Sequence, residues 1–138
     1  VIGAGEMATL VAKAVKARGL KAIFVANRTY ERAELLAREV NGVAVKFEKI
    51  GEFIPGVDVL ICATSAPHPI ITEQLIKNFL EQHNGKRLLL IDIGNPRNIE
   101  EKTGELPGVE LHNIDGLRAI SERNLNLRMM EALKVEKI

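Results

Sequence analysis

Gly3-Ala4-Gly5-Glu6-Met7-Ala8 stands between a short apolar run and a helical pattern, near the start of the sequence. It fits G-x-G-x-x-A, in which the first glycine permits a tight turn and the second lets the backbone approach a pyrophosphate. The small Ala8 allows close packing of helix on strand, and the amino end of the helix attracts phosphate. Glycines also end strands for purely structural reasons, so the prediction of a dinucleotide-binding loop depends on a βαβ context.

Strand and helix patterns alternate along the chain from this loop onward. Helices are predicted after Gly5, Thr29 and Thr72, and short apolar runs typical of buried strands alternate with them. Such alternation implies parallel pairing through right-handed crossovers. We therefore expect an α/β fold of the Rossmann type, with a doubly wound parallel sheet in a three-layer αβα arrangement. The expected strands cover residues 22–26, 43–45, 57–63, 87–93 and 108–112, and the first helix carries its apolar residues at Met7, Leu10, Val11, Ala14 and Val15.

The composition is that of a soluble globular protein of one domain. The 138 residues are 46% hydrophobic and 27% charged, with a net charge of +1 and 4% aromatic residues, which argues against a nucleic-acid surface. The single cysteine, Cys62, excludes an internal disulfide and agrees with a reducing cytoplasm. We find no apolar run long enough for a membrane and no metal-ligand spacing, so we expect a cytoplasmic protein with no membrane partner and no metal.

The residues that follow the predicted strand at 22–26 indicate which nucleotide is bound. An acidic residue there binds the ribose 2′-hydroxyl of NAD, whereas an arginine accommodates the 2′-phosphate of NADP. Asn27-Arg28-Thr29 occupies this place. Arg28 can stack on adenine and pair with the phosphate, Asn27 and Thr29 can donate hydrogen bonds, and Arg32 adds a positive charge. We predict NADPH over NADH; in the alternative, Arg28 and Arg32 are only solvated surface charges.

Loops after the predicted strands at 57–63 and 87–93 supply the other side of the cleft. Ala63-Thr64-Ser65 can receive a nicotinamide ribose, and Gly94 permits close approach of the nicotinamide. Three further residues invite catalytic roles, but we assign none. His68 lies between two prolines as a loop residue does, Cys62 lies within an apolar strand, and Asp92 is favoured as a support for loop backbone over a catalyst. The predicted cofactor-binding residues are Gly3, Ala4, Gly5, Glu6, Met7, Asn27, Arg28, Thr29, Arg32, Ala63, Thr64, Ser65 and Gly94.

Longer stretches resemble the NADPH-binding domain of glutamyl-tRNA reductase. The stretches Ala66-Pro67-His68-Pro69 and Asp92-Ile93-Gly94-Asn95-Pro96-Arg97 are more specific than the glycine loop. Two positions depart from the family pattern: Ala8 stands where Gly is common, and Gly94-Asn95 where Ala-Val is frequent. The resemblance covers nearly the whole chain, at residues 3–7, 25–29, 31–33, 63–71, 90–99, 106–109 and 113–117.

The resemblance implies an NADP-dependent oxidoreductase of tetrapyrrole (porphyrin) biosynthesis that reduces glutamyl-tRNA to glutamate-1-semialdehyde. It implies that a cysteine in a preceding catalytic domain forms a thioester with the glutamyl group, which hydride from NADPH then reduces. Glutamyl-tRNA would be reached through that domain, a following helical domain would form a homodimer, and glutamate-1-semialdehyde aminomutase would be a channelling partner. The chain by itself is then expected to lack reductase activity.

The ends of the sequence suggest how it divides. Val1 and Ile2 are the only apolar residues before Gly3, where a strand usually has about five residues, and there is no initiator Met. We expect residues 1–113 to form an NADP-binding Rossmann domain whose first strand is truncated. Residues 114–138 are charged, with a loosely apolar pattern, and we expect a C-terminal helix there that leads out of the domain toward a dimerisation domain.

Two other functions remain open. The cofactor domain of a shikimate dehydrogenase-like NADP oxidoreductase also carries Gly-Ala-Gly followed by Asn-Arg-Thr, although the loop at Asn95-Pro96-Arg97 favours the tRNA reductase. A non-catalytic NADP sensor module would carry the same motifs, and likeness of fold does not separate these alternatives.

Overall fold

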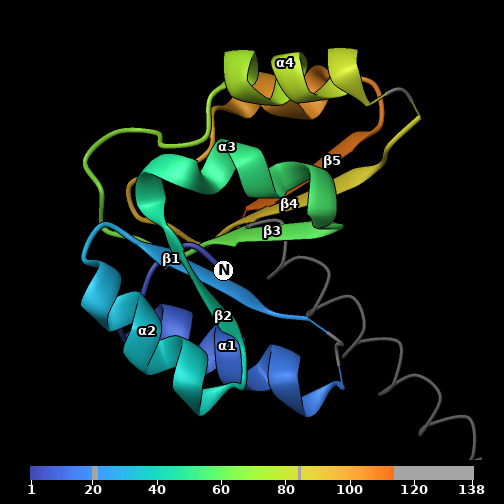
Figure 1. The fold of residues 1–138 in the computed structure, drawn as a ribbon. Coiled ribbons are helices and arrows are strands. Elements are labelled where there is room, and N and C mark those ends of the chain that lie inside the picture. The colour runs from blue at the N-terminus through green and yellow to red at the C-terminus, as the bar shows by residue number, and fades with distance from the viewer. Residues whose placement is uncertain (20–21, 84, 114–138) are drawn as a thin grey trace, which may run out of the picture.

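The computed structural model describes residues 1–19, 22–83 and 85–113, and its strands are all paired in parallel (Figure 1). β1 pairs with β2, while β4 lies between β3 and β5. The predicted α/β class and doubly wound parallel sheet are confirmed. The strands are β1 (Phe24–Asn27), β2 (Val43–Lys46), β3 (Val59–Cys62), β4 (Leu88–Asp92) and β5 (Val109–Asn113).

Ile2 joins the two halves of the sheet. It forms parallel bridges to Ala26 in β1 and to Cys62 in β3. Its N–H donates to Ile61 O (2.7 Å), and its carbonyl accepts from Ala63 N (2.9 Å). The order across the sheet is therefore β2-β1-Ile2-β3-β4-β5. The chain runs outward from Ile2 in both directions, which places the reversal of strand order, where nucleotides bind in such sheets, beside Gly3.

Helices cover both faces of the sheet, which confirms the three-layer arrangement. Figure 1 shows α1 and α2 on one side and α3 and α4 on the other. The segment between β2 and β3, for which we predicted no helix, folds into a succession of short helical turns. The helical elements are α1 (Glu6–Ala17), α2 (Tyr30–Glu39), η1 (Phe47–Lys49), α3 (Ile50–Phe53), η2 (Ile54–Gly56), α4 (Glu73–Gln82) and η3 (Glu101–Glu105).

Two apolar clusters form the core, one on each face of the sheet. Val25 belongs to the cluster under α1 and α2, while the next residue, Ala26, belongs to the cluster on the opposite face. This division follows from the alternation of side chains along a strand. The first cluster contains Ala12, Ile23, Val25, Ala33, Leu36, Ala37 and Val40, and the second contains Ile2, Ala26, Val45, Ile54, Leu60, Cys62, Ile71, Ile76, Phe79, Leu88, Leu90 and Ile99.

The helical spacing of apolar residues in α1 does not identify the residues that the helix buries. Met7 and Leu10 are 48% and 59% exposed, whereas Ala8 and Ala12 are fully buried. The helix approaches the sheet so closely that a Cβ added at Gly3 would lie 3.3 Å from the Cβ of Ala8. Only small side chains fit such a contact, so Met7 and Leu10 face outward, while Val15 packs at the margin of the cluster.

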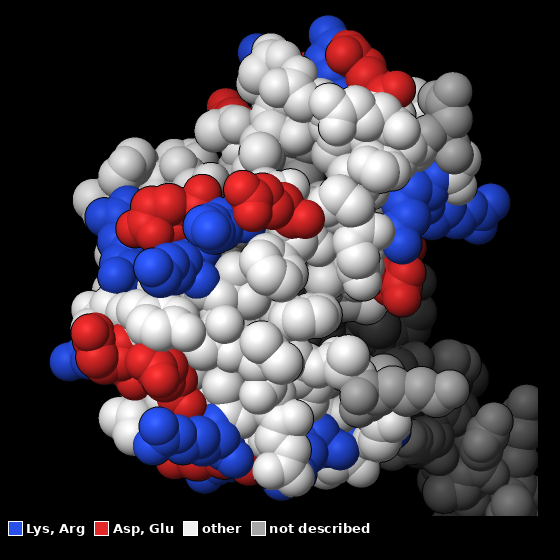
Figure 2. Space-filling model, in the orientation of Figure 1, with Lys and Arg blue, Asp and Glu red and all other residues white. Residues whose placement is uncertain are grey.

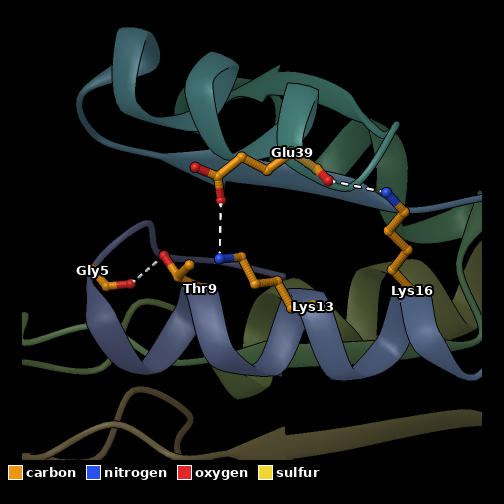
Figure 3. A network of polar contacts seen from close by, with 5 residues as sticks. All are labelled: Gly5, Thr9, Lys13, Lys16 and Glu39. Carbon is orange, nitrogen blue, oxygen red and sulfur yellow. Dashed lines mark hydrogen bonds and ion pairs between the residues drawn. The ribbon is translucent and has the colours of Figure 1, made fainter.

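Polar contacts hold α1 against the end of α2 (Figure 3). The Lys13 ammonium lies 3.7 Å from the Glu39 carboxylate, and Lys16 Nζ donates to the Glu39 carbonyl at 3.1 Å. The Lys13–Glu39 pair is more than half exposed, so it contributes little to stability. The Lys16 contact places a positive charge at the carboxyl end of α2, where it favours the helix dipole.

The starts of α2 and α4 are both predicted correctly, but their caps differ. Thr72 is the N-cap of α4, and its hydroxyl accepts a hydrogen bond from Leu75 N at 3.2 Å. Thr29 is the N-cap of α2 without a side-chain cap bond. The hydroxyl of Thr29 is therefore left available at the surface of the molecule.

An apolar groove of about 440 Å³ opens at the amino ends of β1 and β3, which do not pair directly with each other. Phe24, Phe53, Val59 and Ile61 line it. It lies at the opposite edge of the sheet from the carboxyl ends of the strands.

Charges of both signs are interspersed on the face of the molecule that Figure 2 shows. This distribution agrees with the net charge of +1 and gives that face no field of a single sign. Within the described residues, no helix is long and apolar enough to cross a membrane. The helix predicted over residues 114–138 lies outside the described residues.

Candidate functional site: a cleft at the carboxyl ends of the strands

A cleft of about 680 Å³ lies where β1, β3 and the Ile2 segment end. All but one of the thirteen predicted cofactor-binding residues line it; the exception is Gly94. The cleft residues that sequence reasoning missed are Ile2, Phe47, Ala66, Pro67, Ile70, Ile93 and Asn95.

Gly3 and Gly5 are glycines for different physical reasons. Gly3 has φ +120, and a Cβ there would lie 2.5 Å from the carbonyl oxygen of Ala63, so the fold itself demands glycine. Gly5 has φ −80, which any residue adopts, and a Cβ there would meet no atom within 4 Å. The protein's own packing thus leaves open the space beside Gly5, a residue that lines the cleft.

The amino end of α1 faces this cleft. Gly5 is the N-cap of the helix, and its carbonyl accepts from both the backbone N–H (2.9 Å) and the hydroxyl (2.7 Å) of Thr9. Glu6 and Met7 lie in the first helical turn and line the cleft. N–H groups of a first turn have no partner within their helix, so this end of α1 is suited to bind an anion.

Polar and positive residues follow β1. The side-chain amide of Asn27 donates to the Thr29 carbonyl at 3.1 Å, which fixes the turn into α2. The guanidinium of Arg28 lies over the ring of Phe47, with its Cζ 5.4 Å from the ring centroid. Arg32, one helical turn further on, also lines the cleft. This side of the cleft therefore presents two guanidinium groups from one short segment.

Asp92 organises the loop that follows β4. Its carboxylate is 1% exposed; Oδ1 accepts from Gly94 N, and Oδ2 accepts from the N–H groups of Asn98 and Ile99, each at 2.9 Å. The interpretation of Asp92 as a support for loop backbone is confirmed. The three N–H groups that it satisfies hold residues 94–99 in one conformation.

Asn98 connects this loop to the loop after β3. Its fully buried side chain accepts a hydrogen bond from Thr64 N through Oδ1 (2.9 Å), and its carbonyl accepts from the N–H groups of Ile70 and Ile71. Sequence reasoning missed this residue. Because Asp92 fixes the Asn98 backbone, the position of Thr64 on the cleft wall depends on β4.

Gly94 is buried beneath the rim of the cleft and packs against Asn98. A Cβ at Gly94 would overlap the Asn98 carboxamide. The absence of a side chain here thus serves packing within the loop after β4.

His68 and Cys62, the other two residues considered for a catalytic role, lie away from the cleft wall. His68 is exposed and does not line the cleft. Cys62 is fully buried, and burial, with a smaller contribution from Asp92, raises the pKa of its thiol to about 12. A thiol with such a pKa carries almost no thiolate near neutral pH and is a poor nucleophile. Among the described residues, no group of three or more His, Cys, Asp and Glu side chains is arranged to hold a metal ion.

Comparisons with known proteins agree with this geometry. The family model described as shikimate/quinate 5-dehydrogenase matches residues 1–120. A solved nucleotide-binding domain of glutamyl-tRNA reductase from Thermoplasma volcanium superposes with a TM-score of 0.70 at 30% identity, over 93% of this chain and 82% of that one. The chain belongs to the shikimate/quinate 5-dehydrogenase domain family and to the glutamyl-tRNA reductases.

Other glutamyl-tRNA reductases are still more similar to the chain. That of Methanocella arvoryzae is 54% identical over all of this chain and 32% of its own length. The solved structure of glutamyl-tRNA reductase from Methanopyrus kandleri has a TM-score of 0.88 and 44% identity, covering 99% of this chain and 34% of that one. The chain therefore spans about a third of the length of the glutamyl-tRNA reductases that it matches.

The contact of Gly94 with Asn98 predicts a loss of stability on substitution. Gly94→Ala should lower the free energy of unfolding by about 1–3 kcal/mol, because the added methyl group must displace a buried carboxamide. The control is Gly56→Ala, where a Cβ would meet no atom within 4 Å. Urea denaturation of both variants measures the difference, and equal stabilities would contradict the packing described for Gly94.

The environment of Cys62 predicts an unreactive thiol. In the folded protein at pH 8 a thiol-specific reagent such as DTNB should react with Cys62 several orders of magnitude more slowly than in urea, because burial blocks access and suppresses the thiolate. As this is the chain's one cysteine, the absorbance change reports Cys62 alone. Fast stoichiometric reaction under native conditions would contradict the burial.

Proposed function

We propose that this chain is the NADPH-binding domain of a glutamyl-tRNA reductase. The observation that supports it most directly is the pairing of an open space at Gly5 with the amino end of α1, on the cleft where the order of strands reverses. Neither backbone conformation nor internal packing requires glycine at this position. Close approach of a ligand's pyrophosphate does require it.

The cleft residues would contact the dinucleotide along its whole length. The loop at residues 3–7 would hold the pyrophosphate through backbone N–H groups. Arg28 and Arg32 would pair with the 2′-phosphate of the adenosine ribose, together with the hydroxyl of Thr29, which makes no cap bond. A guanidinium offers several N–H donors to a phosphate and does not bind a ribose hydroxyl with comparable strength, so NADPH is preferred over NADH.

The loop after β3 would receive the nicotinamide end. Ala63, Thr64 and Ser65 line the opposite wall, and Asn98 fixes Thr64 through its backbone N–H. When bound, the nicotinamide supplies a hydride. The role of these residues is to orient the ring and its ribose; the buried Asp92 and Asn98 keep their loops in place.

In the whole protein, the reaction would be the reduction of glutamyl-tRNA to glutamate-1-semialdehyde for tetrapyrrole synthesis. The reacting cysteine would belong to a catalytic domain, since Cys62 is buried with a raised pKa. Glutamyl-tRNA would bind through that domain, residues 114–138 would lead toward a dimerising helical domain, and the aldehyde would pass to glutamate-1-semialdehyde aminomutase. What supports these roles is the identity of about half with glutamyl-tRNA reductases along the whole chain.

The cofactor proposal is tested by binding measurements on this chain. Isothermal titration calorimetry should give a dissociation constant for NADPH roughly 10–100-fold below that for NADH, the ratio expected for charge-assisted hydrogen bonds to one phosphate. Gly5→Ala should weaken NADPH binding about tenfold or more while changing the unfolding free energy by no more than about 1 kcal/mol. Gly56→Ala is the control for binding. Equal affinities for the two nucleotides, or full affinity in Gly5→Ala, would contradict the proposal.

The reaction is tested in the full-length protein. It should oxidise NADPH when supplied with glutamyl-tRNA, and Gly5→Ala in that protein should reduce this rate about tenfold or more at subsaturating NADPH. Transfer of the glutamyl group onto the protein should continue in the variant, because that step needs no nucleotide. Shikimate-dependent reduction of NADP in place of this activity would assign the domain to a shikimate dehydrogenase.

A further inference from the structure

The aromatic ring beneath Arg28 comes from a segment that the nucleotide motifs do not include. Phe47 is the first residue of η1 and directly follows β2, so it lies at the same edge of the sheet as the end of β1. Its ring is partly buried against the larger apolar cluster and also lines the cleft. The ring is thus anchored in the core on one side and meets the Arg28 guanidinium on the other.

The chemistry of this contact differs from that of an ion pair. No carboxylate in the described part of the chain forms an ion pair with Arg28. A carboxylate would neutralise the guanidinium and occupy its N–H groups, in competition with a phosphate. An aromatic face attracts the cation through its quadrupole and uses none of the N–H donors. The ring can therefore hold Arg28 in place while leaving its charge and donors for a ligand.

Holding Arg28 in place has a consequence for binding. An exposed arginine has many rotamers, and fixing it on binding costs conformational entropy. A ring that already holds the guanidinium at the cleft reduces that cost, which favours the ligand that the guanidinium recognises. The benefit should appear only for a ligand that carries a phosphate at this position.

We propose that Phe47 is a positioning residue for Arg28 and thereby a determinant of NADPH specificity. This proposal rests on the proposed function, because it requires that Arg28 recognise the 2′-phosphate. The sequence motifs place all determinants of nucleotide specificity after β1. This proposal adds a residue that follows β2. In the alternative, Phe47 is only a core residue, and its replacement by another large apolar side chain would leave specificity unchanged.

The test compares dissociation constants of NADPH and NADH, by calorimetry, in the wild-type chain, Phe47→Leu and Phe47→Tyr. Phe47→Leu keeps an apolar side chain but removes the aromatic face, and it should weaken NADPH binding about 2–5-fold, the size of a cation–π contact at an exposed site, with NADH binding unchanged. Phe47→Tyr should retain the wild-type ratio. Phe47→Met provides the same comparison if the leucine variant does not fold.

Two controls separate positioning from general loosening of the structure. Phe53→Leu removes a ring that packs on Phe24 (5.6 Å between centroids) and lines the groove at the opposite edge, so it should leave the NADPH to NADH ratio unchanged. In an Arg28→Ala background, Phe47→Leu should no longer alter the ratio, because the effect acts through Arg28.

The outcomes distinguish the two proposals. If the wild-type chain does not prefer NADPH, the assignment of the cofactor is wrong. If the wild-type chain prefers NADPH and Phe47→Leu, though folded, keeps the full ratio, the role of Phe47 is overturned while the cofactor assignment stands. The same conclusion follows if Phe53→Leu reduces the ratio as much as Phe47→Leu does, or if the effect persists without Arg28.

Discussion

The hydrogen bonds of Ile2 and Gly3 to both neighbouring strands are the constraint on which the rest of the structure depends. Ile2 bonds to Ile61 and Ala63, and Gly3 N donates to the Ala26 carbonyl at 2.7 Å. Through these bonds a short segment joins β1 and β3, which do not pair with each other. The same segment leads at once into the loop and α1. Continuity of the sheet and the position of the proposed phosphate-binding loop are therefore set by one set of contacts.

The opposite wall of the cleft is held by a different device. Asp92 is buried at the end of β4 and accepts hydrogen bonds from three backbone N–H groups, one of them that of Asn98. The Asn98 side chain in turn accepts a hydrogen bond from Thr64 N. Loops usually have little to fix them at a sheet edge, because their backbone groups bond to water. Here buried side chains take the place of water. The proposed nicotinamide side of the cleft is thus preorganised by side chains that do not themselves reach its surface.

The two ends of the cleft differ in how much freedom their side chains keep. The wall after β3 is fixed by backbone hydrogen bonds, whereas Arg28 is an exposed side chain that lies on an aromatic ring. This difference suits the proposed ligand. A nicotinamide must be oriented for hydride transfer, while a 2′-phosphate needs only charge and donors within reach. The fixed loop after β3 therefore suits the nicotinamide end, and the exposed Arg28 side chain suits the 2′-phosphate end.

Sequence alone determined the fold class and most of the cleft. The alternation of strand and helix patterns permits few topologies, and parallel strands bring their carboxyl ends to one edge, so motifs after successive strands predict a common site. That is why Gly3, Gly5, Arg28 and Thr64 could be grouped from their positions in the chain. A local pattern is sufficient where the chemistry lies in the residues that directly follow a strand.

Only the tertiary structure decided which residues face which neighbours. The outward position of Met7, the burial of Gly94 against Asn98, and the place of Phe47 under Arg28 all depend on three-dimensional packing that the local sequence pattern does not show. Helical spacing gives the period of an apolar face but not how closely the helix approaches the sheet. Likewise, a glycine in a loop is compatible with a ligand or with a packed carboxamide, and only its surroundings in three dimensions distinguish the two.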